Sequence, residues 1–424
     1  MQIQMQTTPG TPCINETRLW QRLMTLGQIG ATPNGGVNRQ ALSAEEIEAW
    51  RVMIAWAEQA GLDAFTDPAG NLFLRLAGRD PTAKPVLSGS HLDSQPAGGR
   101  FDGVYGVLAA LEVLITLAES QWQPQCDLIA VAWMNEEGSR FAPGMMGSEG
   151  FARGRSMAEI RAACDVDGIT AGDALDALLR NFETLPQRPL GFPLAAYVEA
   201  HIEQGPVLEA QRKTIGVVTA IQGKKTYDVT IRGTRGHAGT LAMSQRRDAV
   251  TAFARICYAL DAEIGGYDDI VKFTIGRVQV LPNAPSVIAD SVSFSIDLRH
   301  PDNAVLNALG NRINMICGAE ARPCDVQVTL LVNAPSNGFD AGIQRTIEQS
   351  AAARGYPSMH LLSAAGHDAR YMAKLAPSAM IFIPCRGGVS HAEHEWAEPA
   401  HVAAGAAVLL DTLMTLTTLT AGGN

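Results

Sequence analysis

The chain has 424 residues, of which 46% are hydrophobic and 18% charged, a composition that indicates a globular protein and excludes a disordered one. Lys and Arg number 33 and Asp and Glu 43, giving a formal net charge of −10. This argues against a nucleic-acid or anionic-membrane partner, because either needs a basic surface. The cysteines are scattered without a CxxC pair, which argues against a disulfide framework or a cysteine zinc site.

Neither end of the chain suggests export or anchoring. Residues 1–13 lack the basic and apolar regions of a signal peptide. The apolar stretches are too short or too interrupted to span a bilayer. We therefore expect a cytoplasmic protein without a membrane partner, and a frayed tail over 415–424.

The first part of the chain alternates predicted helices and strands. Ser43 and Glu46 have the spacing of a helix-capping box, and apolar residues follow at helical intervals. Another helix is predicted to begin directly after Asp102. The expected strands of this part and of the C-terminal part are 71–76, 84–88, 128–133, 195–199 and 378–383, of which the continuous apolar run 128–133 is typical of a buried parallel strand.

The middle of the chain is predicted to form a separate α+β unit. Several of its strands alternate polar and apolar residues, and two helices separate them, which favours a small, mainly antiparallel, ferredoxin-like sheet. The expected strands are 215–222, 226–232, 270–281, 287–299 and 325–332, and the expected helices are 249–264 and 303–316.

The predicted fold is therefore an α/β catalytic domain, with a mainly parallel sheet flanked by helices, interrupted by an inserted α+β domain. Candidate metal ligands occur both before and after the middle unit, which makes the catalytic domain discontinuous. Its two parts are 1–214 and 333–424. The insertion, 215–332, is expected to act as a lid or dimerisation domain.

Five residues of metal-ligand type follow the predicted strands: His91, Asp102, Glu137, His201 and His391. Open α/β sheets place their sites beyond the carboxyl ends of parallel strands. Three imidazoles and two carboxylates, one of them shareable, suit two divalent metal ions, with zinc favoured and manganese, cobalt or nickel as alternatives. The combination points to hydrolysis by a metal-bound water.

Two further carboxylates have other predicted roles. Glu136 ends a buried strand, where an unpaired charge is costly, and is predicted to be the general base that moves a proton from water to the leaving nitrogen. The ordinary alternative for paired glutamates is a solvated helix start. Asp93, two residues after His91, is expected to hold the second ring nitrogen of that histidine. The approach through 387–390 favours His391 over His394 as the ligand.

Three polar residues outside this set are candidates for binding substrate. His237, in a glycine-flanked loop, could donate to a developing oxyanion, although an incidental turn histidine is the ordinary interpretation. Arg299 ends an apolar-patterned strand and must find an anion, which is either a substrate carboxylate or a neighbour such as Asp297. His367 is either an incidental residue near a helix cap or a polar group at the substrate.

Taken together, these motifs resemble the amidase, hydantoinase/carbamoylase branch of the dinuclear zinc-peptidase (M20-type) superfamily. The strings that carry the resemblance are HLDSQPAGGRFDG at 91–103, MNEEGSRF at 134–141 and HIEQGPVLE at 201–209. The similarity runs from about residue 19 to residue 410. By motif, the nearest members are N-carbamoyl-L-amino-acid hydrolases, β-ureidopropionases and allantoate amidohydrolases.

The resemblance implies a role for each candidate residue. His91 and His201 would bind one metal, Glu137 and His391 the other, with Asp102 bridging them and Glu136 as the base. The insertion would form a homodimer in which His237 serves the active site of the other subunit. The implied substrate contacts are Arg299, for a substrate carboxylate, and Gln204, His367, Ser286 and Asn283.

The chain departs from the family pattern at positions around the pocket. Ser286 stands where the family commonly has an asparagine, and Leu241-Ala242 and Glu149 also differ from the usual strings. The metal ligands are intact, so the exact substrate, the native metal and the stereospecificity stay open while the reaction class does not.

We expect a hydrolase of a linear carbamoyl or ureido C–N bond in an N-carbamoyl amino acid or a related carboxylate-bearing ureido compound. One alternative is an M20-type dipeptidase or aminoacylase, which would use the same metals. Another is a non-catalytic dimeric metal-binding relative, which the presence of Glu136 and of every ligand disfavours.

Overall fold

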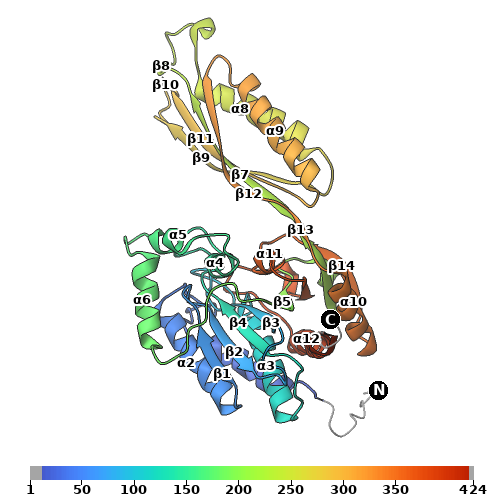
Figure 1. The fold of residues 1–424 in the computed structure, drawn as a ribbon. Coiled ribbons are helices and arrows are strands. Elements are labelled where there is room, and N and C mark those ends of the chain that lie inside the picture. The colour runs from blue at the N-terminus through green and yellow to red at the C-terminus, as the bar shows by residue number, and fades with distance from the viewer. Residues whose placement is uncertain (1–11, 420–424) are drawn as a thin grey trace. The chain divides into compact units, whose positions relative to one another are not determined.

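The computed structural model describes residues 12–419 (Figure 1). Backbone contacts divide the chain into two compact units. Unit 2 is Ala220–Gly338, and unit 1 is formed by the chain on either side of it. Both boundaries lie slightly later than those expected from the sequence. The N-terminal segment searched for a signal peptide lies almost wholly outside the described residues.

Unit 1 contains all but the last strand, β13, of a nine-stranded sheet with the order β1-β2-β4-β3-β5-β15-β6-β13, in which β14 also pairs with β6 (Figure 1). Strands β4, β3, β5 and β15 are parallel to their neighbours within this group. The pairs β1–β2, β2–β4, β6–β15 and β6–β13 are antiparallel. The strands are β1 Asp63–Thr66, β2 Leu72–Leu76, β3 Val86–His91, β4 Leu128–Trp133, β5 Ala196–Ile202, β6 Ile215–Ile221, β13 Asn337–Gly338, β14 Ser358–Ser363 and β15 Ser378–Ile383.

The prediction of a mainly parallel sheet is therefore wrong, because the sheet is mixed. Parallel neighbours require a long crossover connection, whereas β1 and β2 are joined by a short turn that permits only antiparallel pairing. The parallel character is confined to the four central strands. Their carboxyl ends lie together at one edge of the sheet, where the candidate ligands occur.

Helix α3, Val104–Glu119, is the core helix of unit 1, since every residue from Val104 to Leu117 is buried. It packs on β3, β4 and β5. At the start of α2, the Ser43 side chain accepts a hydrogen bond from the Glu46 amide, as the capping signal predicts. The other helices of this unit are α1 Glu16–Leu26, α2 Ala44–Gln59, α4 Met146–Phe151, α5 Met157–Ala162, α6 Ala171–Asn181, α7 Val207–Ala210, α10 Ala341–Ala353, α11 Ala369–Met372, the 3₁₀ turn η3 Arg386–Gly388 and α12 Pro399–Leu419.

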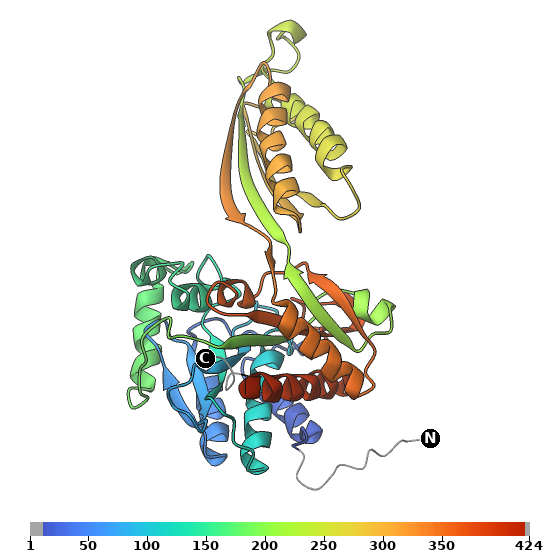
Figure 2. The same ribbon diagram turned by 45° about the vertical axis from the view of Figure 1, so that its right-hand side comes forward.

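Helix α12 corrects two expectations. It extends to Leu419, so the predicted frayed tail is wrong for 415–419, and 420–424 lie outside the described residues. The segment Pro399–Thr418 is also long and apolar enough to cross a membrane by length and composition, but 72% of its most apolar stretch is buried inside the protein. The helix lies along α10 (Figure 2) and also packs on α3 and the sheet. These contacts explain the apolar sequence, and a cytoplasmic location stays a prediction.

Unit 2 has the β-α-β-β-α-β order of a ferredoxin-like fold, with a four-stranded antiparallel sheet in the order β12-β7-β11-β9. Alternate residues of β11 are buried in one hydrophobic core with residues of α8 and α9. Its elements are β7 Gly223–Arg232, β8 Gly236–His237, the 3₁₀ turn η1 Met243–Gln245, α8 Ala249–Leu260, the π-helical turn η2 Asp261–Gly265, β9 Lys272–Leu281, β10 Val287–Ile288, β11 Ser291–His300, α9 Asn303–Glu320 and β12 Asp325–Ala334.

The single strand predicted over 287–299 is two strands. Strand β10 pairs with β8, while β11 pairs with β7 and β9. The chain changes partner between them, and this change brings Val287 opposite His237. The period-2 pattern of 291–299 is real, but it does not reveal where the pairing partner changes.

Candidate metal centre

The candidate ligands of unit 1 gather beyond the carboxyl ends of its parallel strands. His91 is the last residue of β3, and His201 is the last but one of β5. Glu137 follows β4, and His391 lies in the loop after β15. Asp102 immediately precedes Gly103, the residue that caps the N-terminus of α3. Residues far apart in sequence therefore meet at one edge of the sheet, as the strand pattern predicts.

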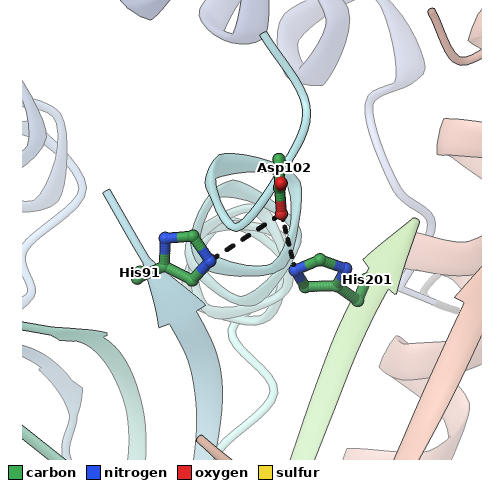
Figure 3. Close-up of side chains that lie close together, drawn as sticks. All are labelled: His91, Asp102 and His201. Carbon is green, nitrogen blue, oxygen red and sulfur yellow. Dashed lines mark ion pairs between the residues drawn. The ribbon is translucent and has the colours of Figure 1, made fainter. Parts of the chain in front are cut away.

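The carboxylate of Asp102 lies between two groups of side chains. Its Oδ1 is 3.9 Å from His91 Nε2 and 3.2 Å from His201 Nε2 (Figure 3). Its Oδ2 is 3.1 Å from His391 Nε2, and the same His391 nitrogen is 3.4 Å from Glu137 Oε2. One oxygen of Asp102 thus faces each group, the arrangement of a carboxylate that bridges two cations.

Both buried histidines are oriented by their second ring nitrogen. Nδ1 of His91 is 2.9 Å from the carbonyl oxygen of Asp93, and Nδ1 of His201 is 2.9 Å from that of Ile202. Because a carbonyl oxygen only accepts, each Nδ1 donates, so in the neutral imidazole the lone pair lies on Nε2, the nitrogen that faces Asp102. The backbone therefore selects the tautomer that a ligand needs.

Gly103 permits this packing. Its φ is +67°, and a Cβ at this position would lie 2.3 Å from Cε1 of His91. A side chain would thus be strained by the backbone conformation and would overlap the imidazole. The glycines of the loop allow Asp102 to approach the histidines closely.

Asp93 acts through different atoms than the sequence predicts. We expected its carboxylate to bind the second nitrogen of His91, but Oδ1 is 3.6 Å from that nitrogen and the hydrogen bond is made by its carbonyl. The two carboxylate oxygens instead accept from the amides of Glu136 and Glu137, each at 3.1 Å. Asp93 therefore ties the His91 loop to the turn that carries the base and a ligand. The prediction fails because sequence spacing does not distinguish a backbone acceptor from a side-chain acceptor.

Glu136 is 9% exposed, and its Oε2 lies 3.6 Å from His91 Nε2. Burial, together with the nearby Asp368 and Glu137, raises the pKa of Glu136 well above its usual value. Burial and the charge of Asp102 raise the pKa of Glu137 to about 7. Several carboxylates therefore lie together in a buried site. Their ionised forms are unfavourable there unless positive charges lie beside them.

Asp102 behaves in the opposite way. Burial alone would raise its pKa, but hydrogen bonds with His201 and His391 outweigh burial and hold the pKa well below its usual value. Although burial disfavours the charged imidazole, the hydrogen bond to Asp102 raises the pKa of His201 to about 9. The same contact raises the pKa of His391 to about 9. Protons on the two imidazoles therefore occupy the positions that metals would take.

The structure brings two predicted pocket residues to this centre. Gln204 Nε2 lies 3.0 Å from Asp102 Oδ2 and 3.1 Å from Ser390 Oγ. The ring of His367 lies 4.5 Å from that of His201, centre to centre, and its Nε2 is 2.9 Å from Ser363 Oγ. His367 is 2% exposed, and burial, with the charge of His201, holds its pKa well below its usual value.

The other predicted residues belong to unit 2. His237 is exposed on β8, and its Nδ1 accepts from the Gly239 amide at 3.0 Å. Ser286 and Asn283 are exposed in the β9–β10 loop, and the Ser286 carbonyl accepts from the amide of Ala238. The β8–β10 pairing therefore keeps His237 and Ser286 in one local structure.

Arg299 makes the contact that the sequence offered as the alternative to substrate binding. Its Nε donates to Asp297 Oδ1 at 2.8 Å, and Lys224 Nζ is 3.2 Å from Asp297 Oδ2. The side chains of Arg299 and Asp297 are each 31% exposed. The pair lies on β11, at the positions that alternate with its buried core residues.

Sequence reasoning missed two buried glutamates. Glu199 is fully buried and accepts from Ser90 Oγ at 2.7 Å. Glu395 is 2% exposed and accepts from the amides of Phe101 and Asp102. A charge within the buried strand of Glu199 was an available signal, whereas nothing in the 387–395 loop distinguishes Glu395 from the neighbouring Glu393.

The donor set fits two divalent cations. The ligand-type atoms of His91, Asp102 and His201 lie within 4.8 Å of one another, as do those of Asp102, Glu137 and His391. Each group combines nitrogen and oxygen donors without cysteine, which suits zinc or manganese. The residues therefore satisfy the ligand number and type that two metals sharing Asp102 would need.

Comparison with known proteins identifies the family of the chain. Residues 87–415 match the model of peptidase family M20/M25/M40. The N-carbamoyl-L-amino-acid amidohydrolase of Rhizobium meliloti is 38% identical over 95% of this chain and 96% of its own length. The allantoate amidohydrolase of Escherichia coli is 36% identical over 89% of this chain and 91% of its own length.

A solved structure resembles the whole chain. The hydantoinase/carbamoylase family amidase from Burkholderia multivorans has a TM-score of 0.88 and 40% sequence identity, covering 96% of this chain and 98% of its own. The likeness thus includes the segments that carry every candidate ligand.

Metal binding should release protons from the ligand set. At pH 7.5 both His201 and His391, with pKa values of about 9, are protonated in the metal-free protein, so a metal must displace about two protons from them. Calorimetric titration of Zn²⁺ into chelator-treated protein should give an enthalpy that depends on the ionisation enthalpy of the buffer. The part of this dependence that comes from the two imidazoles should decrease as the pH rises through about 9. An enthalpy at pH 7.5 that is the same in all buffers would contradict the prediction.

Proposed function

The chain belongs to peptidase family M20/M25/M40, and we propose that it hydrolyses a linear carbamoyl or ureido C–N bond in a carboxylate-bearing compound. The observation that carries this proposal is the position of Asp102, with one oxygen toward each of two ligand groups, beside the buried Glu136. Relatives named for N-carbamoyl amino acids and allantoate support the substrate class.

Two cations would be held by unit 1. His91 and His201 would bind one, Glu137 and His391 the other, and Asp102 both. When bound, divalent cations polarise a carbonyl oxygen and make water acidic enough to attack at neutral pH. Zinc is the first candidate, and manganese, cobalt or nickel would accept the same donors.

Glu136 would perform the proton transfers. The oxygen of the attacking water forms a bond to the carbamoyl carbon while Glu136 takes a proton from that water. The C–N bond then breaks, and Glu136 delivers the proton to the leaving nitrogen. Asp93 fixes the backbone of Glu136, so the carboxylate is oriented before the substrate binds.

Unit 2 would supply the remaining groups. We propose that His237 donates a hydrogen bond to the negative charge that develops on the carbamoyl oxygen, and that a homodimer formed through unit 2 provides this residue to the other subunit. The edge strand β12 supports such an association, because its Leu330, Leu331 and Val332 are 46%, 60% and 40% exposed. An exposed apolar edge is a pairing surface that two-fold association covers.

We propose a substrate-binding role for each of the remaining candidate residues. Arg299 would bind the substrate carboxylate, held ready by its ion pair with Asp297. Gln204 and His367 would line the pocket beside the metals. Asn283 and Ser286 would contact the group attached to the ureido moiety, and the short Ser286 side chain leaves room for a larger substituent than an asparagine would.

Metal-reconstituted protein should release ammonia from at least one of three compound classes: N-carbamoyl-L-amino acids, β-ureidopropionate and allantoate. Glu136→Gln should lower kcat by on the order of 10²–10⁴-fold, because it removes the proton carrier. The variant should still bind two equivalents of metal, measured by elemental analysis after gel filtration. Near-normal turnover in a fully loaded variant would contradict the role of Glu136, and inactivity of the metal-loaded wild type on all three classes would contradict the substrate class.

Mixing two inactive variants tests the role of His237 across a dimer. A hybrid of Glu136→Gln and His237→Ala subunits contains one site with both residues intact, so activity should return after subunit exchange. Each variant alone, and a chain carrying both substitutions mixed with itself, should remain inactive. Verified hybrids without activity would place His237 in its own subunit's site, whereas full activity of His237→Ala alone would place it outside any site.

Arg299→Lys should impair substrates that carry a carboxylate more than their amide analogues. The guanidinium can pair two donors with two oxygens, which a lysine ammonium cannot reproduce. We expect kcat/KM for the carboxylate substrate to fall by an amount equivalent to roughly 1.5–3 kcal/mol. Arg277→Lys is a matched control, since Arg277 also pairs with an aspartate of unit 2. Equal losses for acid and amide would make Arg299 a purely structural partner of Asp297.

A further inference from the structure

Glu395 is a buried carboxylate that connects two segments of the metal centre. It follows His391 by four positions, yet its side chain faces the loop that carries Asp102, more than 290 residues earlier in the chain. The proposed reaction gives it no task. A glutamate that is 2% exposed needs hydrogen bonds to offset the loss of water, so its partners identify its role.

One oxygen of Glu395 holds the backbone of the Asp102 loop. Oε1 accepts from the Phe101 amide at 2.9 Å and from the Asp102 amide at 3.1 Å. These two amides stand just before α3, where the chain turns into the helix. Because the Asp102 amide is fixed, the starting point of its side chain is fixed too.

The other carboxylate oxygen of Glu395 contacts the loop that carries His391. Oε2 accepts from Ser390 Oγ at 2.9 Å, and that hydroxyl lies 3.1 Å from Asp102 Oδ2. Ser390 directly precedes His391. Glu395 therefore restrains the bridging carboxylate through the backbone and His391 through its neighbour.

The space around this contact is closed. A Cβ on Gly99 would lie 2.0 Å from Glu395 Oε1, so the loop approaches the carboxylate as closely as glycine allows. The neighbouring rings of Phe101 and Trp396 pack edge to face at 5.6 Å. This apolar contact joins the same two segments without the carboxylate, so the fold does not depend on Glu395 alone.

We propose that Glu395 is a positioning residue that sets metal affinity by fixing Asp102 and the His391 loop relative to each other. The inference rests on the proposed metal centre and adds a residue that binds neither metal nor substrate. Groups that orient metal ligands typically change metal affinity 10–100-fold when they are removed. The affinity for both metals should fall, because Asp102 would bind both. The affinity for the metal held by Glu137 and His391 should fall more, because only that ligand group contains His391.

The test is metal affinity in the full-length chain. Zn²⁺ titration into chelator-treated Glu395→Ala should show at least tenfold weaker binding, with unequal losses for the two equivalents. The visible spectrum of the Co²⁺-loaded protein should change, since the ligand geometry is altered. Glu395→Gln keeps an oxygen for the two amides and should restore most of the affinity. Glu393→Gln, two residues away and hydrogen-bonded to Thr32 and Asn34, is the matched control and should bind as the wild type.

The outcomes separate this inference from the proposed function. Asp102→Ala must lose both metals; if it does not, the metal centre and this inference fail together. If Asp102→Ala loses metal while Glu395→Ala keeps wild-type affinity and the wild-type Co²⁺ spectrum, only the role of Glu395 is overturned. Should Glu395→Ala not fold, Ser390→Ala removes the hydrogen bond to Oε2 together with the contacts that this hydroxyl makes with Asp102 and Gln204; an unchanged affinity for both equivalents would then overturn the proposal. None of these measurements depends on identifying the substrate.

Discussion

The shared carboxylate of Asp102 is the interaction on which the rest of the centre depends. A buried carboxylate is costly unless both oxygens are satisfied, and here one oxygen faces His91 and His201 while the other faces His391. This requirement explains the glycines of its loop, since Gly103 must leave room for the His91 ring. The parallel pairing of β3, β4, β5 and β15 makes this arrangement possible, because strands far apart in sequence then end at the same place.

The acidic side chains around Asp102 fit a site that holds cations. Glu136, Glu137 and Glu199 are acids in a region with little water, and burial is the largest cause of the raised pKa of each. The histidines relieve part of this repulsion by holding protons. Two divalent cations would replace those protons with larger charges and leave the carboxylates ionised, which is the state that a base and its neighbouring ligands need.

The sequence predicts the ligand set well because ligand type, strand ends and glycine spacing all act locally. It also predicts the α+β insertion, since alternation and helical spacing survive in unit 2. It fails where the outcome depends on distant partners. The antiparallel edges of the sheet, the carbonyl contact of Asp93 and the role of Glu395 are set by segments that no local pattern connects. Helix α12 was missed for the same reason, because its burial, and not a periodic face, defines it.

The division into two units separates the candidate ligands and base from most of the candidate substrate contacts. All five candidate ligands and Glu136 belong to unit 1, whereas His237, Arg299, Asn283 and Ser286 belong to unit 2. Two of the three departures from the family pattern, at Ser286 and at Leu241-Ala242, also fall in unit 2. Substitutions there alter neither the ligands nor the base. A chain organised in this way can change which ureido compound it accepts while the bond that it breaks stays the same, so the intact centre is the stronger guide to its reaction and the altered loops are the stronger guide to its substrate.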